Sequence, residues 1–195
     1  CFVVGCAGVY YAFFGCFFIL LMGIISLAKY KDIVKLLTAI ILTAFITIGV
    51  LVSLSPTIFY KIEFGDNPEA AQRTPVEAEV YGLKINQLIL PISNHRLDVI
   101  AEKKALYDQN AMLINENSCS SLGMVGSFGF LLLVLFAFLP RFFKNDILST
   151  LIPLNLGAIL LATIGGFGSL FAMFISPSIR GYNRISVYIA YFSLL

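Results

Sequence analysis

Residues 2–28 read FVVGCAGVYYAFFGCFFILLMGIISLA and contain no charged side chain. About 20 consecutive apolar residues are enough for a helix to cross the hydrocarbon core of a bilayer. The block is also too long for the apolar centre of a signal peptide. It therefore predicts a membrane-spanning helix, and hydrocarbon as the solvent around much of the chain.

The composition agrees with this prediction. Of the 195 residues, 59% are hydrophobic and 12% are charged, against about 25% charged in an average soluble domain. The net charge is only +2, and no basic patch is interleaved with aromatic residues in the way that single-strand binders require. We therefore expect membrane lipids, and not nucleic acid, as partners.

Further apolar blocks occupy about 34–54, 122–139 and 147–175. The predicted fold class is all-α, with four full transmembrane helices and a truncated fifth. Pro56 is expected to end the second span, because proline cannot continue the helical hydrogen-bond ladder. The apolar run 185–195 is about half the length that a bilayer requires, so we expect the chain to be a fragment of a longer protein.

Three regions follow from these blocks: a transmembrane hairpin at 1–54, a polar loop at 55–121, and transmembrane helices at 122–195. The short turns between the spans carry Lys29, Lys31, Lys35, Arg141 and Lys144. Short loops rich in lysine and arginine stay in the cytoplasm. The 55–121 loop and the Arg180 region are therefore expected outside it.

The polar loop has helical periodicity. Tyr81, Ile85, Leu88 and Ile92 recur at spacings of four, three and four, which predicts an amphipathic helix lying in the membrane interface. Leu97, Ile100, Ala101 and Leu106 predict a second, weaker helix after His95 and Arg96.

Glycine clusters occur in three spans. The Gly5, Gly8, Ala12 and Gly15 series favours close helix packing, with a substrate groove as the alternative. The series Gly123, Gly126 and Gly129 favours packing as well. Gly165, Gly166 and Gly168 either pack tightly or mark a functional break in the fourth span, as in transporters whose interrupted helices line a wet cavity.

The candidate catalytic residues are Glu77, Glu79 and His95. Two residues apart on a helix, the glutamates point about 200° from one another, so they do not form a paired acid and base. Either one is a candidate general base, or both complement a helix dipole after Pro75. His95 is the only histidine; it is a capping or surface group unless it serves catalysis.

Arg73 and Arg96 are candidate phosphate or carboxylate clamps, since a guanidinium presents a bidentate fork; local ion pairs are the alternative. Arg180 and Arg184 either anchor to lipid phosphate or bind the phosphate of a lipid-linked substrate. Asn115 and Glu116 are suited to sugar hydroxyls or a cation, or form a polar helix start.

Cofactor signals are weak. Cys1, Cys6 and Cys16 lie in the first apolar block, Cys119 lies in the loop, and no CxxC or Cys/His metal spacing occurs. No metal site or cofactor is identifiable. A divalent cation at Asn115 and Glu116 is an open alternative that no ligand spacing supports.

Four motifs follow one another between the spans. They are RTPxExExYGLK at 73–84, His95-Arg96, Asn115-Glu116-Asn117, and RGYNRIS at 180–186, which contains Tyr182 and Asn183. Together they resemble the later part of large bacterial membrane proteins similar to GT-C-type glycosyltransferases, whose relatives are labelled sugar translocase or YfhO-like.

The resemblance covers about residues 55–195. It implies the inner (plasma) membrane of a bacterium, transfer of a sugar from a polyprenyl-phosphate carrier at the outer face, and substrate contacts from the motif residues. The family's carboxylate base lies in a first outer loop that has no identifiable copy here, so the resemblance assigns no catalytic residue.

We therefore expect a membrane glycosyltransferase-like protein that acts on a lipid-linked sugar. The alternatives are a transporter or flippase for a sugar-containing lipid, and a non-catalytic membrane assembly subunit. An enzyme predicts that the loop and the arginines of the 180–184 segment meet at one outer surface. A transporter predicts a break at Gly165–Gly168 instead.

Overall fold

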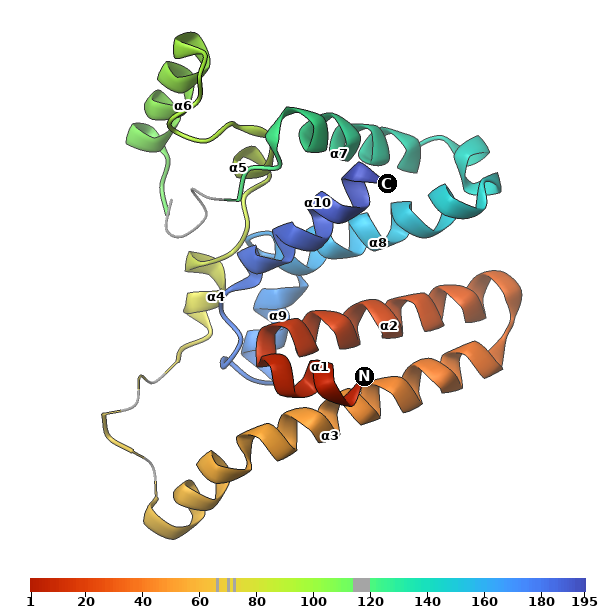
Figure 1. Ribbon diagram of the computed structural model, residues 1–195, viewed down its shortest axis with the longest axis vertical. Coiled ribbons are helices and arrows are strands. Elements are labelled where there is room, and N and C mark those ends of the chain that lie inside the picture. Colours follow the sequence, from red (N-terminus) through yellow and green to blue (C-terminus); the bar gives the residue numbers. More distant parts are fainter. Residues whose placement is uncertain (66, 70, 72, 114–119) are drawn as a thin grey trace. The chain divides into compact units, whose positions relative to one another are not determined.

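A computed structural model describes residues 1–65, 67–69, 71, 73–113 and 120–195. The chain is 76% helix and has no strand among these described residues, as Figure 1 shows. The all-α prediction is therefore confirmed. The chain divides into two compact units, Cys1–Gln72 and Arg73–Leu195, which we describe separately.

Unit 1 consists of α1 (Phe2–Ala7), α2 (Val9–Tyr30) and α3 (Ile33–Phe64). Both α1 and α2 pack against α3 (Figure 1). Gly8 separates the first two helices with a φ of 152°, a backbone conformation that residues with a Cβ rarely adopt. The prediction of one unbroken span over 2–28 is therefore wrong at its N-terminal end.

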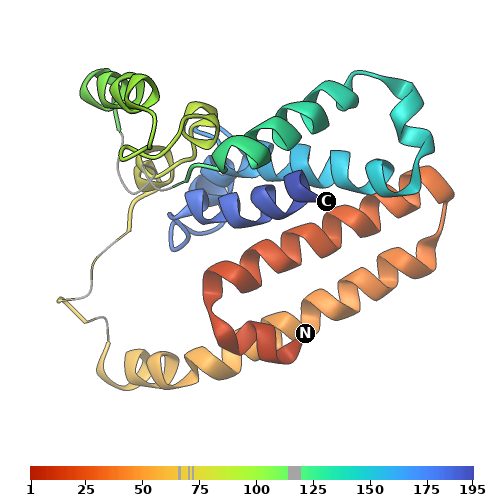
Figure 2. The same cartoon turned by 45° about the horizontal axis from the view of Figure 1, so that its top comes forward.

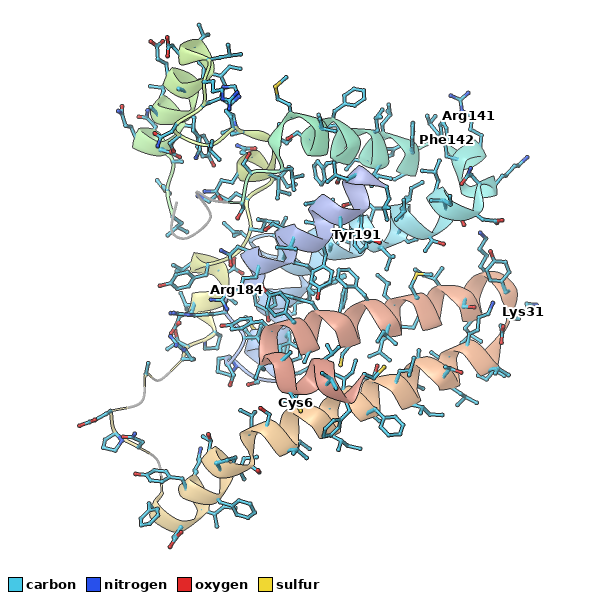
Figure 3. The ribbon with its side chains drawn as sticks, in the orientation of Figure 1. Cys6, Lys31, Arg141, Phe142, Arg184 and Tyr191 are labelled. Carbon is cyan, nitrogen blue, oxygen red and sulfur yellow. The ribbon has the colours of Figure 1, made fainter. Side chains whose placement is uncertain are left out.

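The turn between α2 and α3 is built from its own polar residues. Lys31 takes the left-handed conformation that ends α2, and it lies at the tip of this hairpin in Figure 3. The Asp32 carboxylate accepts hydrogen bonds from the N–H groups of Val34 and Lys35, at 3.1 and 3.2 Å. This cap satisfies two of the otherwise unpaired N–H groups at the start of α3.

The prediction that the second apolar helix ends at Pro56 is wrong, because α3 continues through Pro56 to Phe64. Proline removes the N–H that would bond to the Val52 carbonyl. The Ser55 hydroxyl donates to that carbonyl instead, at 2.8 Å. A neighbouring side chain thus compensates for the missing donor, and the predicted boundary at residue 54 lies inside a helix.

Two helices, α2 and α3, are long and apolar enough to cross a membrane. Their mean hydropathies are 2.3 and 2.5, and only 28% and 17% of their most apolar windows is buried within the protein. Such exposure of apolar side chains is costly in water. It favours membrane association.

Unit 2 is organised around α7 (Gly123–Ala137), α8 (Asp146–Ala162) and α10 (Ser186–Leu194), which pack against one another (Figure 2). The 3-10 helix η2 (Pro140–Lys144) joins α7 to α8, and η3 (Tyr182–Ile185) precedes α10. At Gly129 of α7, a Cβ would lie 1.9 Å from the Ser193 carbonyl oxygen. Close packing, as predicted for this glycine, is therefore present.

The predicted fourth span does not form one helix. The helix α8 ends at Ala162, and α9 (Phe167–Phe174) begins five residues later. The intervening residues make a turn containing Gly165, whose φ is 73°. The glycine-rich stretch therefore does interrupt the helix, whatever its function.

The polar segment of unit 2 contains α4 (Val76–Val80), α5 (Ile85–Ile89) and α6 (Asp98–Asn110). The helix predicted after Arg96 is confirmed as α6, which projects from the rest of unit 2 in Figures 1 and 2. The amphipathic helix predicted over 81–92 is wrong. The chain turns between α4 and α5, Ile85 and Ile92 are exposed, and Gln87 is buried.

Candidate functional site: an arginine–carboxylate cluster beside a broken helix

Glu77 of α4 accepts hydrogen bonds from two arginines that are far apart in sequence. Its Oε2 lies 3.1 Å from Nη1 of Arg180 and 3.4 Å from Nη1 of Arg73. The Arg180 side chain is 27% exposed and the Glu77 side chain 22% exposed. Two positive charges and one negative charge therefore meet in a place that solvent still reaches.

Local structure holds both partners in place. Glu77 lies in the first turn of α4, where its Oε1 accepts from the backbone N–H of Thr74 at 3.3 Å. The Arg180 guanidinium lies over the ring of Tyr81, 4.6 Å from its centroid. Contact with the face of an aromatic ring is favourable for a guanidinium. The Glu77 carboxylate and the Arg180 guanidinium are thus each oriented by a second contact besides their own ion pair.

Opposing effects act on the ionisation of Glu77. Partial burial raises the pKa of its carboxyl, but the hydrogen bonds from Arg180 and Thr74 and the charges of both arginines outweigh burial and hold the pKa below its ordinary value. Glu77 is therefore ionised at neutral pH. Formally, Arg73, Arg180 and Glu77 sum to one excess positive charge.

Glu79, on the same short helix, has a different partner. Its Oε2 accepts a hydrogen bond from the backbone N–H of Gly165 at 2.9 Å. Glu77 and Glu79 thus point to separate partners, which agrees with the 200° expected from their spacing. They form no paired acid and base here.

Two backbone hydrogen bonds join the same segment to the helix break. The Leu83 N–H donates to the Ala162 carbonyl at 2.8 Å, and the Ile164 N–H donates to the Leu83 carbonyl at 3.3 Å. Leu83 and Thr163 form an isolated parallel bridge. The end of α8 therefore finds donors and acceptors in the polar segment, which satisfies backbone groups that a helix end leaves unpaired.

Tyr182 and Asn183, predicted to bind substrate, are both buried in unit 2. A Cβ at Gly168 would lie 2.7 Å from the Tyr182 ring, so the ring packs directly on the backbone of α9. Both residues contribute to the core in this structure. Their predicted role in binding stays a prediction.

The other predicted arginines lie at different places. Arg184 is exposed in η3, just before α10, at the end of unit 2 opposite to Arg141 (Figure 3). Arg96 is exposed just before α6. It takes part in none of the contacts described above for Glu77, Arg73 and Arg180. Asn115 and Glu116 lie outside the described residues.

His95 has a local structural role. Its Nδ1 accepts a hydrogen bond from the Leu97 N–H at 3.1 Å, immediately before α6. This agrees with the capping alternative, and it assigns the proton of the neutral ring to Nε2. In the part of the chain that the structure describes, no three His, Cys, Asp or Glu side chains form a group that would hold a metal ion.

Two features of the site were not predicted from the sequence: the Tyr81 ring beneath Arg180, and the pairing of Leu83 with Thr163. Gly82 was an available signal, because a Cβ there would lie 2.9 Å from the Ile164 side chain. A glycine at a point of close backbone approach is typical. Its partner segment, about 80 residues away, has no signal in a single sequence.

Comparison of this chain with protein-family models, curated proteins and solved structures finds no match.

Proposed function

We propose that this chain forms part of an integral membrane protein that binds the phosphate of a polyprenyl-phosphate-linked sugar, as the resemblance to GT-C-type glycosyltransferases implies. The single observation that carries the proposal is the convergence of Arg73 and Arg180 on one oxygen of Glu77. A carboxylate oxygen held by two guanidiniums has the same acceptor chemistry as a phosphate oxygen. The excess positive charge favours a ligand with more negative charge than Glu77.

In this proposal α2, α3, α7 and α8 cross the bilayer of a bacterial inner membrane. The helices α7 and α8 have 15 and 17 residues, which corresponds to about 23 and 26 Å. Flanking apolar residues such as Leu122 and Phe138 extend α7 toward the roughly 30 Å of hydrocarbon.

The positively charged turns favour one orientation of the protein in the membrane. Arg141 and Arg184 lie at opposite ends of unit 2 (Figure 3), as expected if the short α7–α8 turn is cytoplasmic and the cluster faces outward. On sealed cells, an impermeant amine reagent is expected to label Lys103 and not Lys31. Equal labelling of both lysines contradicts this orientation.

The binding test places the chain in nanodiscs and compares a polyprenyl phosphate with the uncharged polyprenol. Arg180→Ala is expected to weaken phosphate binding about tenfold or more, because a charge-assisted hydrogen bond contributes about 1.5–3 kcal/mol. Glu77→Gln is expected to strengthen it, since the carboxylate competes for the same donors. A gain in affinity cannot result from misfolding.

Arg141→Ala is the matched control, because it removes one arginine at the far end of unit 2. The affinity of this variant for polyprenyl phosphate is expected to equal that of the unchanged protein. The proposal fails if the chain prefers polyprenol or binds both probes equally, or if Glu77→Gln weakens binding as much as Arg180→Ala does. Transfer of sugar is then measured separately, with a polyprenyl-phosphate sugar as donor.

A transporter or flippase for a sugar-containing lipid is the second candidate. The observation that favours it is the interruption between Ala162 and Phe167, since broken helices at membrane depth accompany substrate pathways in transporters. Reconstituted vesicles distinguish the two functions. Translocation of a fluorescent lipid-linked sugar without sugar transfer favours the transporter.

A further inference from the structure

A cavity of about 570 Å³ lies in unit 2 where α5, α6 and the start of α7 meet. Its apolar walls come from all three elements: Ile89 and Ile92 from α5 and the residues after it, Ile100 from α6, and Leu122 and Met124 from the N-cap and first turn of α7. The volume is within the range typical of small-molecule pockets, about 300–1,000 Å³.

The wall between α5 and α7 is held by hydrogen bonds. The Leu122 N–H donates to the Leu88 carbonyl at 2.9 Å, and the Ser127 hydroxyl lies 3.3 and 3.4 Å from the carbonyl oxygens of Leu88 and Ile89. These bonds satisfy the carbonyls at the end of α5. This wall of the cavity is therefore built into the fold of unit 2.

The lining residues that the structure describes favour an uncharged ligand. None of these nine residues is an acid, a lysine or an arginine, and the polar side chains among them are those of His95 and Ser121. Each accepts one backbone hydrogen bond: His95 Nδ1 accepts from the Leu97 N–H, and Ser121 Oγ accepts from the Gly123 N–H at 3.4 Å. An uncharged, mainly apolar group matches this lining.

Met124, which lines the cavity, also belongs to an exposed apolar face of α7. Met124 is 74% exposed, and next to it on the helix are Val125, at 73%, and Phe128, at 66%. Side chains as apolar as these favour hydrocarbon contact. Whatever surrounds this face of α7 therefore contacts Met124, which is also part of the cavity lining.

We propose that the cavity takes an acyl chain of a membrane phospholipid, which enters beside Met124 and contacts Ile92 and Ile100. This inference rests on the placement of α7 in the membrane under the proposed function. The bound acyl chain would hold α6 and the segment after α5 against the bilayer. No bond is formed or broken.

The test uses the absence of tryptophan from the sequence. A single introduced tryptophan is then the only tryptophan emitter, and bromine atoms on the acyl chains of phosphatidylcholine quench it on contact. Three single variants are reconstituted in vesicles with and without brominated chains: Ile100→Trp in the cavity, Val99→Trp as its neighbour outside the lining, and Phe128→Trp on the exposed face of α7. Ile92→Trp repeats the cavity measurement from a second wall.

Brominated chains are expected to remove most of the emission of Ile100→Trp, Ile92→Trp and Phe128→Trp, and to leave that of Val99→Trp nearly unchanged. If only Phe128→Trp is quenched, α7 lies in the membrane but the cavity does not hold a lipid chain. If Val99→Trp is quenched as strongly as Ile100→Trp, the whole of α6 lies in hydrocarbon and the cavity is not selective.

Two further outcomes overturn the inference. If Phe128→Trp also keeps its emission, α7 is outside the bilayer, and the proposed membrane arrangement of unit 2 fails with it. If Ile100→Trp emission shifts with protein concentration and not with bromination, the occupant is a second copy of the chain. Folding of each variant is checked by its helical circular dichroism.

Discussion

The backbone N–H of Gly165 donates a hydrogen bond to the carboxylate of Glu79, 86 residues earlier in the chain, across 2.9 Å. This contact joins the short helix α4 to the point where α8 gives way to α9. Because Glu77 lies on the same turn of α4, the arginine cluster and the helix break share one small element. Both proposed functions of unit 2 therefore depend on the position of α4.

Removing the Glu79 carboxylate is expected to destabilise unit 2. Glu79→Ala leaves the Gly165 N–H without this acceptor at a turn whose φ is 73°. A hydrogen bond to a charged group contributes about 1.5–3 kcal/mol, and partial solvent access reduces this toward about 1 kcal/mol. Unfolding of the detergent-solubilised protein measures the loss, and Val76→Ala, an exposed neighbour on α4, is the control. Equal stability of the two variants contradicts the structural role of Glu79.

The stability of unit 2 is expected to depend on the ionisation of Glu77. Because its folded pKa lies below the ordinary value, ionised Glu77 stabilises the fold fully above the ordinary glutamate pKa of about 4.3. That contribution is lost as the pH falls through the lower folded pKa. The difference in melting temperature between the unchanged protein and Glu77→Gln is therefore expected to be constant near neutral pH and to vanish in acid.

The Asp32 carboxyl also has a lowered pKa, first because of the hydrogen bond from the Lys35 N–H. It is present in both proteins, so its effect cancels in the difference. A melting-temperature difference that persists unchanged into acid would show that the carboxylate charge of Glu77 has no part in stability.

Substitution of Gly129 is expected to force α7 and α10 apart. The new Cβ of Gly129→Ala would lie 1.9 Å from the Ser193 carbonyl oxygen, which belongs to backbone and cannot rotate away. Overpacking of this kind costs about 1–3 kcal/mol, measured as the free energy of unfolding. Gly15→Ala is the matched control in α2, since nothing lies within 4 Å of its Cβ. Gly15→Ala is expected to leave the free energy of unfolding unchanged, or to raise it by up to about 1 kcal/mol.

The Ser55 hydroxyl is expected to matter only while Pro56 is present. Ser55→Ala removes the donor to the Val52 carbonyl and is expected to cost about 0.5–1.5 kcal/mol. In the Pro56→Ala background the new N–H bonds to that carbonyl, so the same substitution is expected to cost less. A double-mutant cycle measures the coupling, and additive effects would contradict the compensation.

The helical class and the approximate positions of most helices were predictable from the sequence. Apolar blocks of about 20 residues have one structural solution in hydrocarbon, because every backbone N–H and C=O must be paired within the segment. The α6 helix was predictable for a different reason, because apolar residues there recur at helical spacing. The end of α3 was not predictable from Pro56, because the compensation depends on the rotamer of Ser55.

The candidate site was predictable only in part. Arg73, Glu77 and Arg180 were each identified from residue type, since guanidinium and carboxylate groups have limited chemistry. Their convergence was not, because no local periodicity relates residue 77 to residue 180. The failure of the predicted 81–92 helix has the same origin, since the pairing of Leu83 with Thr163 overrides local helical preference.

The sequence alone therefore determined that apolar helices precede and follow a polar segment along the chain. The transfer of side chains between water and hydrocarbon depends on composition over short windows, which can be read from the sequence. The tertiary structure decided which backbone groups at the ends of those helices find partners. At the break after Ala162 these partners are Glu79 and Leu83. Hydrogen bonds require contact within about 3 Å, and contact between distant segments is a property of the folded chain.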